Sequence, residues 1–168
     1  MRVLERGWVS SNNILLFDGD YSATLIDTGY VAHSDQTLLL VRHALNGRQL
    51  TRIINTHLHS DHCGGNALLK KTLGPTVLIP PGHAEAVGRW DDAALGYSAC
   101  GQACDRFMHD ALIQPGERLM LAGAEWQAFA SPGHDPHSIV LWNSHDRALI
   151  SADALWQHGF GAIFLEVE

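Results

Sequence analysis

The sequence predicts an α/β fold, a single domain over residues 1–168 in which mixed β-sheets form a sandwich with helices. Apolar runs with strand character occur near both ends of the chain, and runs of helical length lie between them. No internal repeat, low-complexity tract or linker divides the chain. Hydrophobic residues make up 46% and charged residues 17% of the composition, so the chain can bury a core of its own.

The first half of the chain indicates a hairpin followed by a crossover. The apolar runs NILLF (13–17) and SATLIDT (22–28) flank the turn residues DGD, which is typical of a hairpin. Residues 35–46 have the length of a helix and stop at Gly47, a suitable C-terminal cap. The β-rich run RIIN (52–55) follows. Strand, helix and strand in this order predict two parallel strands joined by a helix.

The second half predicts a further helix, a lid and more strands. A helix begins near Gly64 and Gly65 and is stopped by Gly74 and Pro75. Residues 88–116 are expected to form a helical lid. The aromatic side chains of this segment either contact a substrate or anchor it to the core: Trp90, Tyr97 and Phe107. Strands are predicted at residues 76–80, 125–130, 138–142 and 147–152.

The charge balance limits the partners. The formal net charge is −7 and the isoelectric point is near 5.8, whereas nucleic acids and anionic membranes bind surfaces rich in Lys and Arg. No apolar run approaches the length of a bilayer span, and the start MRVLERGWVSSNN lacks the apolar core of a signal peptide. We therefore expect a cytoplasmic protein with a small-molecule substrate and without nucleic-acid or membrane partners.

The three cysteines are too few, and odd in number, for a disulfide framework. Cys100 and Cys104 are four residues apart, so on a helix their thiols would share a face and could form half of a metal site or a redox pair. The alternative is two small, partly buried residues. Cys63 is either a metal-sensitive thiol or a small residue packed under the start of a helix.

The stretch NTHLHSDHCGG places four metal-affine side chains within six positions. His57 and His59 are two apart on backbone that is still extended after a strand, so they project to the same side. Asp61 and His62 follow where the chain turns before two glycines, and they can face a second point nearby. Two imidazoles form the core of a nitrogen-rich zinc site, and a carboxylate beside a third imidazole can hold another ion. The alternative, a polar surface loop, is disfavoured because the stretch ends a buried strand.

These residues carry a resemblance to a known family. THLHSDHCGG is similar to the H-x-H-x-D-H signature of the metallo-β-lactamase superfamily. Three further segments resemble, in the family's order, the strand and turn beneath the metal site, the loop that delivers a third histidine, and the strand end with a bridging aspartate. These segments are LIDTG (25–29), SPGHDPHS (131–138) and LISADAL (149–155), and the resemblance covers the chain from about Asn13 to Leu155.

The resemblance implies an αββα sandwich with a binuclear site at one edge of its two sheets. That site would hold one or two zinc ions, and iron is a second metal that the same ligands accept. The first metal would be bound by His57, His59 and His134. The second would be bound by Asp61, His62 and Asp153, with Asp153 shared by both ions.

Other residues near these motifs are expected to have lesser roles. Asp27 would fix the loop below the ligands without touching metal. His137 follows His134 by three positions and could contact a ligand or a substrate, but we do not expect it to bind metal. The histidines outside the motifs are expected to be surface or capped residues: His83, His109 and His145.

One part of the family pattern is missing. Family members normally supply a last histidine to the second metal from a loop some tens of residues after the bridging aspartate, but only 15 residues follow Asp153. His158, in the stretch WQHGFGAIF that resembles a loop passing over the site, is a poor substitute. We therefore expect a C-terminally truncated member of the fold. A sheet edge and an apolar face left uncovered favour self-association.

The chemistry follows from the ligands. Zinc lowers the pKa of a bound water to about 7 and polarises a carbonyl, and Asp61 is the expected catalytic residue because it could orient that water or carry its proton to the leaving group. We therefore predict a zinc-dependent hydrolase that uses a metal-bound hydroxide on a small acyl substrate of the thioester, lactone or β-lactam type. The alternatives are an iron-dependent persulfide oxidoreductase of the same fold and a catalytically disabled metal-binding fragment.

Overall fold

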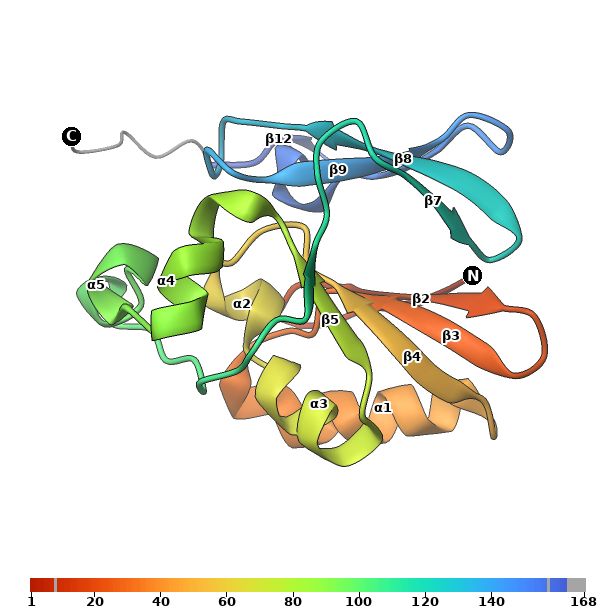
Figure 1. Ribbon diagram of the computed structural model, residues 1–168, viewed down its shortest axis with the longest axis horizontal. Coiled ribbons are helices and arrows are strands. Elements are labelled where there is room, and N and C mark those ends of the chain that lie inside the picture. The colour runs from red at the N-terminus through yellow and green to blue at the C-terminus, as the bar shows by residue number, and fades with distance from the viewer. Residues whose placement is uncertain (8, 157, 163–168) are drawn as a thin grey trace.

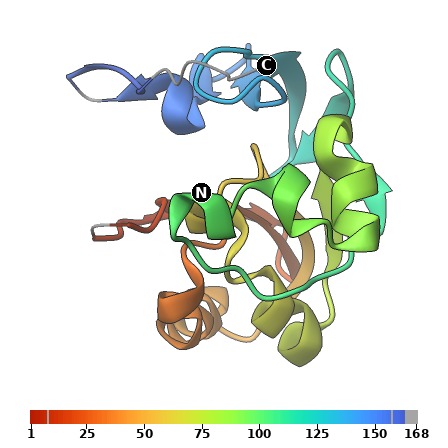
Figure 2. The same cartoon turned by 90° about the vertical axis from the view of Figure 1, so that its left-hand side faces the viewer.

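The computed structural model describes residues 1–7, 9–156 and 158–162. Two β-sheets pack face to face, and helices lie on the outer face of the first sheet (Figure 1). Figure 2 shows these layers from the side, with the helices of residues 34–45 and 66–73 on the far side of the first sheet from the second. The predicted α/β sandwich is confirmed. Within the described part of the chain, no helix covers the outer face of the second sheet.

The first sheet has six strands that neighbour one another in chain order. They are Arg2–Leu4 (β1), Asn13–Asp18 (β2), Ser22–Ile26 (β3), Gln49–Ile54 (β4), Thr76–Ile79 (β5) and Ala111–Leu112 (β6). The pairs β1–β2 and β2–β3 are antiparallel, and β3 to β6 are parallel. The hairpin and the crossover predicted from the sequence are therefore both confirmed.

The helices connect and cover the strands of the first sheet. The α-helices are Ser34–Leu45 (α1), Ser60–Cys63 (α2), Asn66–Leu73 (α3), Ala84–Arg89 (α4) and Asp92–Leu95 (α5), and the 3₁₀ turns are Val31–His33 (η1), Pro81–His83 (η2), Ser98–Cys100 (η3) and Ala152–Ala154 (η4). α1 buries residues at helical spacing, among them Leu38, Val41 and Leu45. It is capped by Asn46 in the left-handed conformation, one residue before the predicted Gly47. None of these helices is long and apolar enough to cross a membrane.

The second sheet is antiparallel throughout and has the strand order β10-β9-β8-β7. Its strands are Arg118–Leu121 (β7), Ala124–Ala130 (β8), Ile139–Asn143 (β9) and Ala148–Ile150 (β10), and a separate hairpin follows at Leu155–Trp156 (β11) and Gly159–Phe160 (β12). The sequence predicted β8, β9 and β10 to within about two residues of these bounds, whereas β7 and the last hairpin were not predicted.

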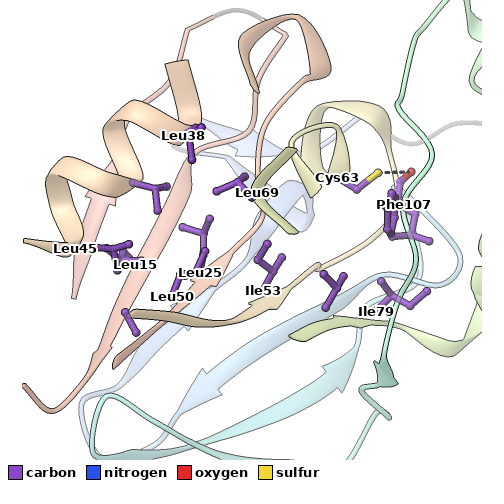
Figure 3. Packing of buried hydrophobic residues seen from close by; sticks show 14 of the residues in the cluster. Leu15, Leu25, Leu38, Leu45, Leu50, Ile53, Cys63, Leu69, Ile79 and Phe107 are labelled. Carbon is purple, nitrogen blue, oxygen red and sulfur yellow. Dashed lines mark hydrogen bonds between the residues drawn. The ribbon is translucent and has the colours of Figure 1, made fainter. Parts of the chain in front are cut away.

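Two apolar cores hold the layers together. The outer core lies between the first sheet and its helices, and Leu25 and Ile53 point into it (Figure 3). The inner core lies between the sheets, where Ile26 and Ile54 meet residues of the second sheet such as Trp126. Neighbouring residues of one strand therefore face opposite cores, as the two-residue repeat of a strand requires. This is why β3 and β4 are apolar on both faces.

The segment predicted as a helical lid is helical only in its first part. Residues 101–110 have neither helix nor strand, and the turns before them end at glycines with positive φ, such as Gly96 at 75°. Tyr97 and Phe107 are buried, and the ring of Trp90 lies 6.1 Å and 5.6 Å from theirs. These aromatic side chains anchor the segment to the outer core, which is the second of the two roles considered for them.

Candidate metal centre

The residues predicted to bind metal come from four separate segments and meet at one end of the sheets. They are His57 and His59 after β4, Asp61 and His62 in α2, His134 in the β8–β9 loop, and Asp153 in η4. Donor atoms of His57, His59 and His134 lie within 4.8 Å of one another, and so do those of His57, His62 and Asp153. The two groups of donors share His57. Asp61 lies beside the second group, with its Oδ2 3.6 Å from Nε2 of His62.

His57 stands at the centre of the cluster. Its ring is 4.0 Å from the ring of His62, 4.5 Å from that of His59 and 5.3 Å from that of His134, measured between centroids. The side chain is buried, and its Nε2 atom has no hydrogen-bond partner among the described residues. A buried nitrogen without a partner is costly unless something binds it. The donor set therefore fits a cation held at Nε2 of His57.

Hydrogen bonds behind the histidines direct their Nε2 atoms toward the centre. Nδ1 of His57 lies 3.1 Å from the Thr56 hydroxyl, which itself donates to Asp27, so the hydroxyl oxygen accepts from the imidazole. Nδ1 of His62 donates to Asp27 at 2.8 Å, and Nδ1 of His134 lies 2.6 Å from the carbonyl oxygen of Ala162. A histidine whose Nδ1–H is held in this way presents the lone pair of Nε2 to a metal.

Two histidines of the first donor group, His57 and His59, have lowered pKa values, which favours the neutral imidazole. Burial lowers the pKa of His57 well below its ordinary value, and the neighbouring imidazoles of His62, His59 and His134 lower it further. Burial also lowers the pKa of His59, against the opposing effect of Asp135. Nδ1 of His59 lies 2.9 Å from Nε2 of His134, so these two nitrogens already face the same point. Neutral imidazoles are the form that binds metal.

The second donor group is charged in the absence of metal. Burial acts to lower the pKa of His62, but the carboxylates of Asp27, Asp153 and Asp61 outweigh it and raise the pKa to about 10. Burial likewise acts to raise the pKa of Asp153, and the histidines His62 and His134 leave it below its ordinary value instead. Oδ2 of Asp153 lies 3.3 Å from Nε2 of His62 and 3.2 Å from Nε2 of His134, which is a position between the two groups.

Asp27 lies beneath the donors and fixes the loop there, which is the position expected for it from the sequence. Its carboxylate accepts from the Thr56 amide at 2.9 Å, from the Thr56 hydroxyl at 2.8 Å and from His62 at 2.8 Å. The residue has a φ of 57°, and Asp is among the residues that tolerate this left-handed conformation best. Two loops that are distant in the sequence are thereby tied together under the donors. Asn55 adds a further tie by donating to the His62 carbonyl at 3.1 Å.

The glycines after the cluster allow α2 to pack against the loop that follows β3. A Cβ atom on Gly64 would lie 2.4 Å from the Val31 amide nitrogen, and one on Gly65 would lie 2.5 Å from the Thr28 carbonyl oxygen. The Gly65 amide donates to the Gly29 carbonyl at 3.2 Å. The sequence explained this glycine pair by the tight entry to a helix; the structure shows that close approach of a second loop requires it as well.

Two cavities open beside the donors. One, of about 990 Å³, is lined by His59, His134 and Asp153 and by a largely apolar wall that includes Leu58, Leu95, Tyr97, Pro136 and Trp156. The other, of about 720 Å³, reaches His62, Asp61 and Asp153 from the side of the N-terminal loop and β10. Asp61 and Asp153 border both cavities.

Two residues near the site were missed or misjudged by sequence reasoning. His83 is not a surface histidine: it borders the larger cavity, and its ring lies 4.7 Å from that of His137. Asp135 is buried, and its Oδ2 lies 3.7 Å from Nε2 of His59. Its position directly after His134 was the available signal. Asp135 comes from the β8–β9 loop of the second sheet, and His83 follows β5, the parallel neighbour of β4, so both meet the donors through contacts between segments distant in the sequence.

His109 was expected to be a surface or capped histidine, but it is half-buried, and its buried Nδ1 atom has no hydrogen-bond partner among the described residues. The remaining histidines considered from the sequence agree with that analysis. His137 belongs to neither donor group, and neither does His158, whose side chain is exposed on the last hairpin. His145 is exposed as well. The stretch predicted to pass over the site does reach it, through Ala162 and Trp156. Gln157 and residues 163 and 164 of that stretch lie outside the described residues.

A two-sheet sandwich with imidazole and carboxylate donors clustered at one end is typical of a class of metal-binding α/β proteins. Residues 6–165 match the sequence profile of the metallo-β-lactamase superfamily. The chain therefore belongs to the metallo-β-lactamase superfamily, as the resemblance in its motifs predicted.

Individual relatives agree with this assignment. The chain is similar to the hydroxyacylglutathione hydrolase of Methylococcus capsulatus, with 30% identity over 118 residues that cover 70% of this chain and 39% of that protein. Among solved structures, the B3 metallo-β-lactamase BLEG-1 has a TM-score of 0.77 at 21% identity, covering 96% of this chain and 75% of that one. A metallo-β-lactamase of Cronobacter sakazakii has a TM-score of 0.67 at 28% identity, covering 83% of this chain and 56% of that one. The present chain thus spans about two fifths of the length of the curated hydrolase.

Proposed function

We propose that this protein is a zinc-dependent hydrolase of a small acyl substrate, and that the bond it cleaves is a thioester. One observation carries the proposal: the Nδ1 atoms of His57, His62 and His134 are held by other groups, so their Nε2 atoms face the donor cluster, and those of His57 and His62 are buried without a hydrogen-bond partner among the described residues. The thioester is favoured because similar curated proteins are named hydroxyacylglutathione hydrolases.

The donors would hold two ions, in the assignment that the motifs suggested. His57, His59 and His134 would hold the first, and Asp61, His62 and Asp153 the second, with Asp153 reaching both. The position of Asp153 between His62 and His134 supports its bridging role. When bound, the ions would supply Lewis acidity that polarises the scissile carbonyl and makes water nucleophilic at neutral pH.

The protein's own groups would position the substrate and move the proton. Asp61 borders both cavities, and its side chain is 30% exposed, so it can accept a proton from the attacking water and return it to the leaving thiolate. The apolar wall of the larger cavity, to which Leu58 and Trp156 contribute, suits an acyl group. His83 at the same wall can donate a hydrogen bond to the substrate.

The test combines metal analysis with a substrate assay. Elemental analysis of the zinc-loaded protein is expected to give up to two equivalents per chain. A hydroxyacyl-glutathione thioester is the first substrate to test. Its hydrolysis is monitored by the loss of the thioester's ultraviolet absorbance rather than with a reagent for the released thiol, because the exposed Cys100 would react with that reagent. His57→Ala is expected to lose both zinc and hydrolysis, whereas the exposed His145→Ala is the matched control and keeps both.

The outcomes separate the parts of the proposal. Zinc-loaded protein that cleaves a lactone or a β-lactam but no thioester would contradict the choice of bond and leave the hydrolase standing. Full zinc occupancy with no cleavage across a panel of all three bond types would overturn the hydrolase. Less than one equivalent of zinc in the presence of excess zinc would overturn the metal centre itself.

A further inference from the structure

A pair of thiols lies directly behind the metal centre. The sulfur of Cys63 is 3.8 Å from the sulfur of Cys104, and all three cysteines of the chain are free. Cys63 ends α2, next to His62, and its side chain is fully buried in the outer core (Figure 3). Cys104 belongs to residues 101–110, which have neither helix nor strand. The sequence raised Cys100 as a partner of Cys104 only if both lay on one helix; the fold places Cys104 beside Cys63 instead.

The surroundings give the two thiols different access to solvent. Cys104 is half-buried and can be reached by a small solute, whereas Cys63 is covered. The Tyr97 hydroxyl donates to the Leu58 carbonyl at 2.9 Å and lies 3.3 Å from the Cys63 sulfur, so its oxygen can accept a hydrogen bond from the thiol. Cys100 is exposed on η3. An oxidant from solvent therefore meets Cys100 and Cys104 before it meets Cys63.

We propose that Cys63 and Cys104 form a reversible disulfide, an oxidation site that responds to hydroperoxides. The Cys104 sulfur attacks one oxygen of the peroxide, the O–O bond breaks, and Cys104 becomes a sulfenic acid as water leaves. The Cys63 sulfur then attacks the sulfur of Cys104, the S–O bond breaks, and the hydroxyl leaves as a second water with the thiol proton. Two thiols are oxidised and one hydrogen peroxide is reduced. A dithiol reductant reverses the reaction.

The geometry permits this bond without rebuilding the core. The sulfurs must approach from 3.8 Å to about 2.05 Å. Cys63 is held by the packing of α2, but Cys104 lies on irregular backbone that can supply the movement. Its own contact there is weak, a 3.7 Å interaction with the Asp105 carbonyl. The Ala103 amide donates a hydrogen bond to the Tyr30 hydroxyl at 3.1 Å, which keeps this segment close to the site.

The bond would join two parts of the candidate site. α2 carries Asp61 and His62, while Cys100 at the end of η3 and Gln102 in the segment after it border the larger cavity. Gln102 already contacts Ser60 at the start of α2. A disulfide at the other end of α2 would clamp this helix to the cavity wall at both of its ends. It would also close a chain loop from residue 63 to residue 104, which restricts the unfolded chain.

Peptide mapping tests the connectivity. Zinc-loaded protein is treated with hydrogen peroxide, the remaining thiols are blocked, and the protein is digested with trypsin. Cleavage after Arg52, Lys70, Arg89 and Arg106 gives peptides 53–70, with Cys63, and 90–106, with Cys100 and Cys104. The expected product is these two peptides joined, with a mass equal to their sum plus the blocking group on Cys100 less two hydrogens, and it is separated by dithiothreitol. Cys100→Ser is expected to keep the link between Cys63 and Cys104, and Cys104→Ser to abolish it.

A second readout does not depend on mapping. The melting temperature of Cys100→Ser is expected to rise by about 5 °C on oxidation and to return on reduction, while that of Cys104→Ser does not rise. Cys63→Ser removes the second thiol, and its melting temperature is likewise expected not to rise. If Cys63→Ser fails to fold, Cys63→Ala replaces it, because alanine keeps the buried position apolar. The proposal is overturned if peroxide links Cys100 to Cys104 within peptide 90–106, if the joined peptides survive in Cys104→Ser, or if Cys104 advances to sulfinic acid with Cys63 still reduced.

Discussion

At the scale of residues, the candidate site depends on how each imidazole is held. His57 and His62 owe their orientation to one carboxylate, Asp27, which acts on His62 directly and on His57 through Thr56. Their pKa values are shifted in opposite directions: burial lowers that of His57, whereas at His62 burial is outweighed by the surrounding carboxylates, Asp27 foremost, which raise its pKa to about 10. One histidine is therefore neutral and the other protonated before metal arrives.

His59→Ala is expected to lower zinc content by about one equivalent per chain, because it removes one nitrogen from a group of three donors. Elemental analysis after dialysis against limiting zinc measures the change, and circular dichroism verifies the fold. His145→Ala serves as the control, because that side chain is exposed and belongs to neither donor group. Retention of the full zinc content in His59→Ala would show that His59 is not a ligand.

Zinc affinity of the second donor group is expected to rise with pH. The pKa of His62 is raised to about 10 in the metal-free protein, so below that pH a proton must leave before Nε2 can bind zinc. The zinc affinity should therefore increase up to tenfold per pH unit and level off only near pH 10. His57 adds no pH dependence above neutral pH, because its pKa is lowered and it is already neutral there. Competition with a chelator between about pH 6.5 and 8.5 measures the slope.

Asp27→Asn is the matched control for this slope. Asn tolerates the left-handed backbone of this position, but it removes the charge that raises the pKa of His62. The slope should then become shallower. An affinity that does not change with pH in the unaltered protein would contradict a protonated His62.

At the scale of elements, the site is built where parallel strands end and a short helix turns back over them. β3 and β4 are neighbours in register from Thr24 to Ile26, so the residues that follow them, Asp27 and Asn55, emerge side by side. α2 then packs on the loop after β3 through Gly64 and Gly65. Any displacement of α2 moves Asp61 and His62 with it.

Gly65→Ala is expected to destabilise the protein by about 1–3 kcal/mol, because its Cβ would lie 2.5 Å from the Thr28 carbonyl oxygen. Gly88→Ala, inside α4 with no atom within 4 Å of its Cβ, should instead stabilise it by about 0.5–1 kcal/mol. Urea denaturation monitored by circular dichroism measures both. Equal effects of the two substitutions would refute the close approach at Gly65.

At the scale of the whole molecule, the second sheet differs from the first in having an apolar outer face. Phe129 and Leu149 are each 43% exposed, and their cross-strand partners Val140 and Trp142 are half-buried. Residues of the same strands that face inward, such as Leu141, are buried in the inner core. Apolar surface of this kind favours association with another surface.

Self-association of this chain stays a prediction of the sequence, and the exposed face supplies its test. Sedimentation equilibrium of the purified chain is expected to show a mass that rises with concentration, and Phe129→Lys is expected to shift it toward the monomer. Met108→Lys is the control, because Met108 is 49% exposed but lies on the segment between α5 and β6, away from this sheet. A monomer at all concentrations would refute the prediction.

The sequence alone determined the features that depend on near neighbours in the chain. The hairpin, the crossover, the helix ends and the orientation of His57 and His59 follow from periodicity, turn residues and spacing, which act over a few residues. His134 and Asp153 were assigned only through the resemblance in their motifs, because nothing in their local spacing relates them to His57.

Only the tertiary structure decided the contacts between distant segments. The packing of one sheet on the other brings Asp135 and Asp153 beside the donors of the first sheet. Neighbouring strands of the first sheet bring Asp27 to His62 and His83 to the larger cavity, and the packing of the outer core sets Cys63 against Cys104 in place of Cys100. Such pairs are 35 to 91 residues apart in the sequence. Their meeting depends on how the layers stack, and no pattern within a single strand or helix encodes that.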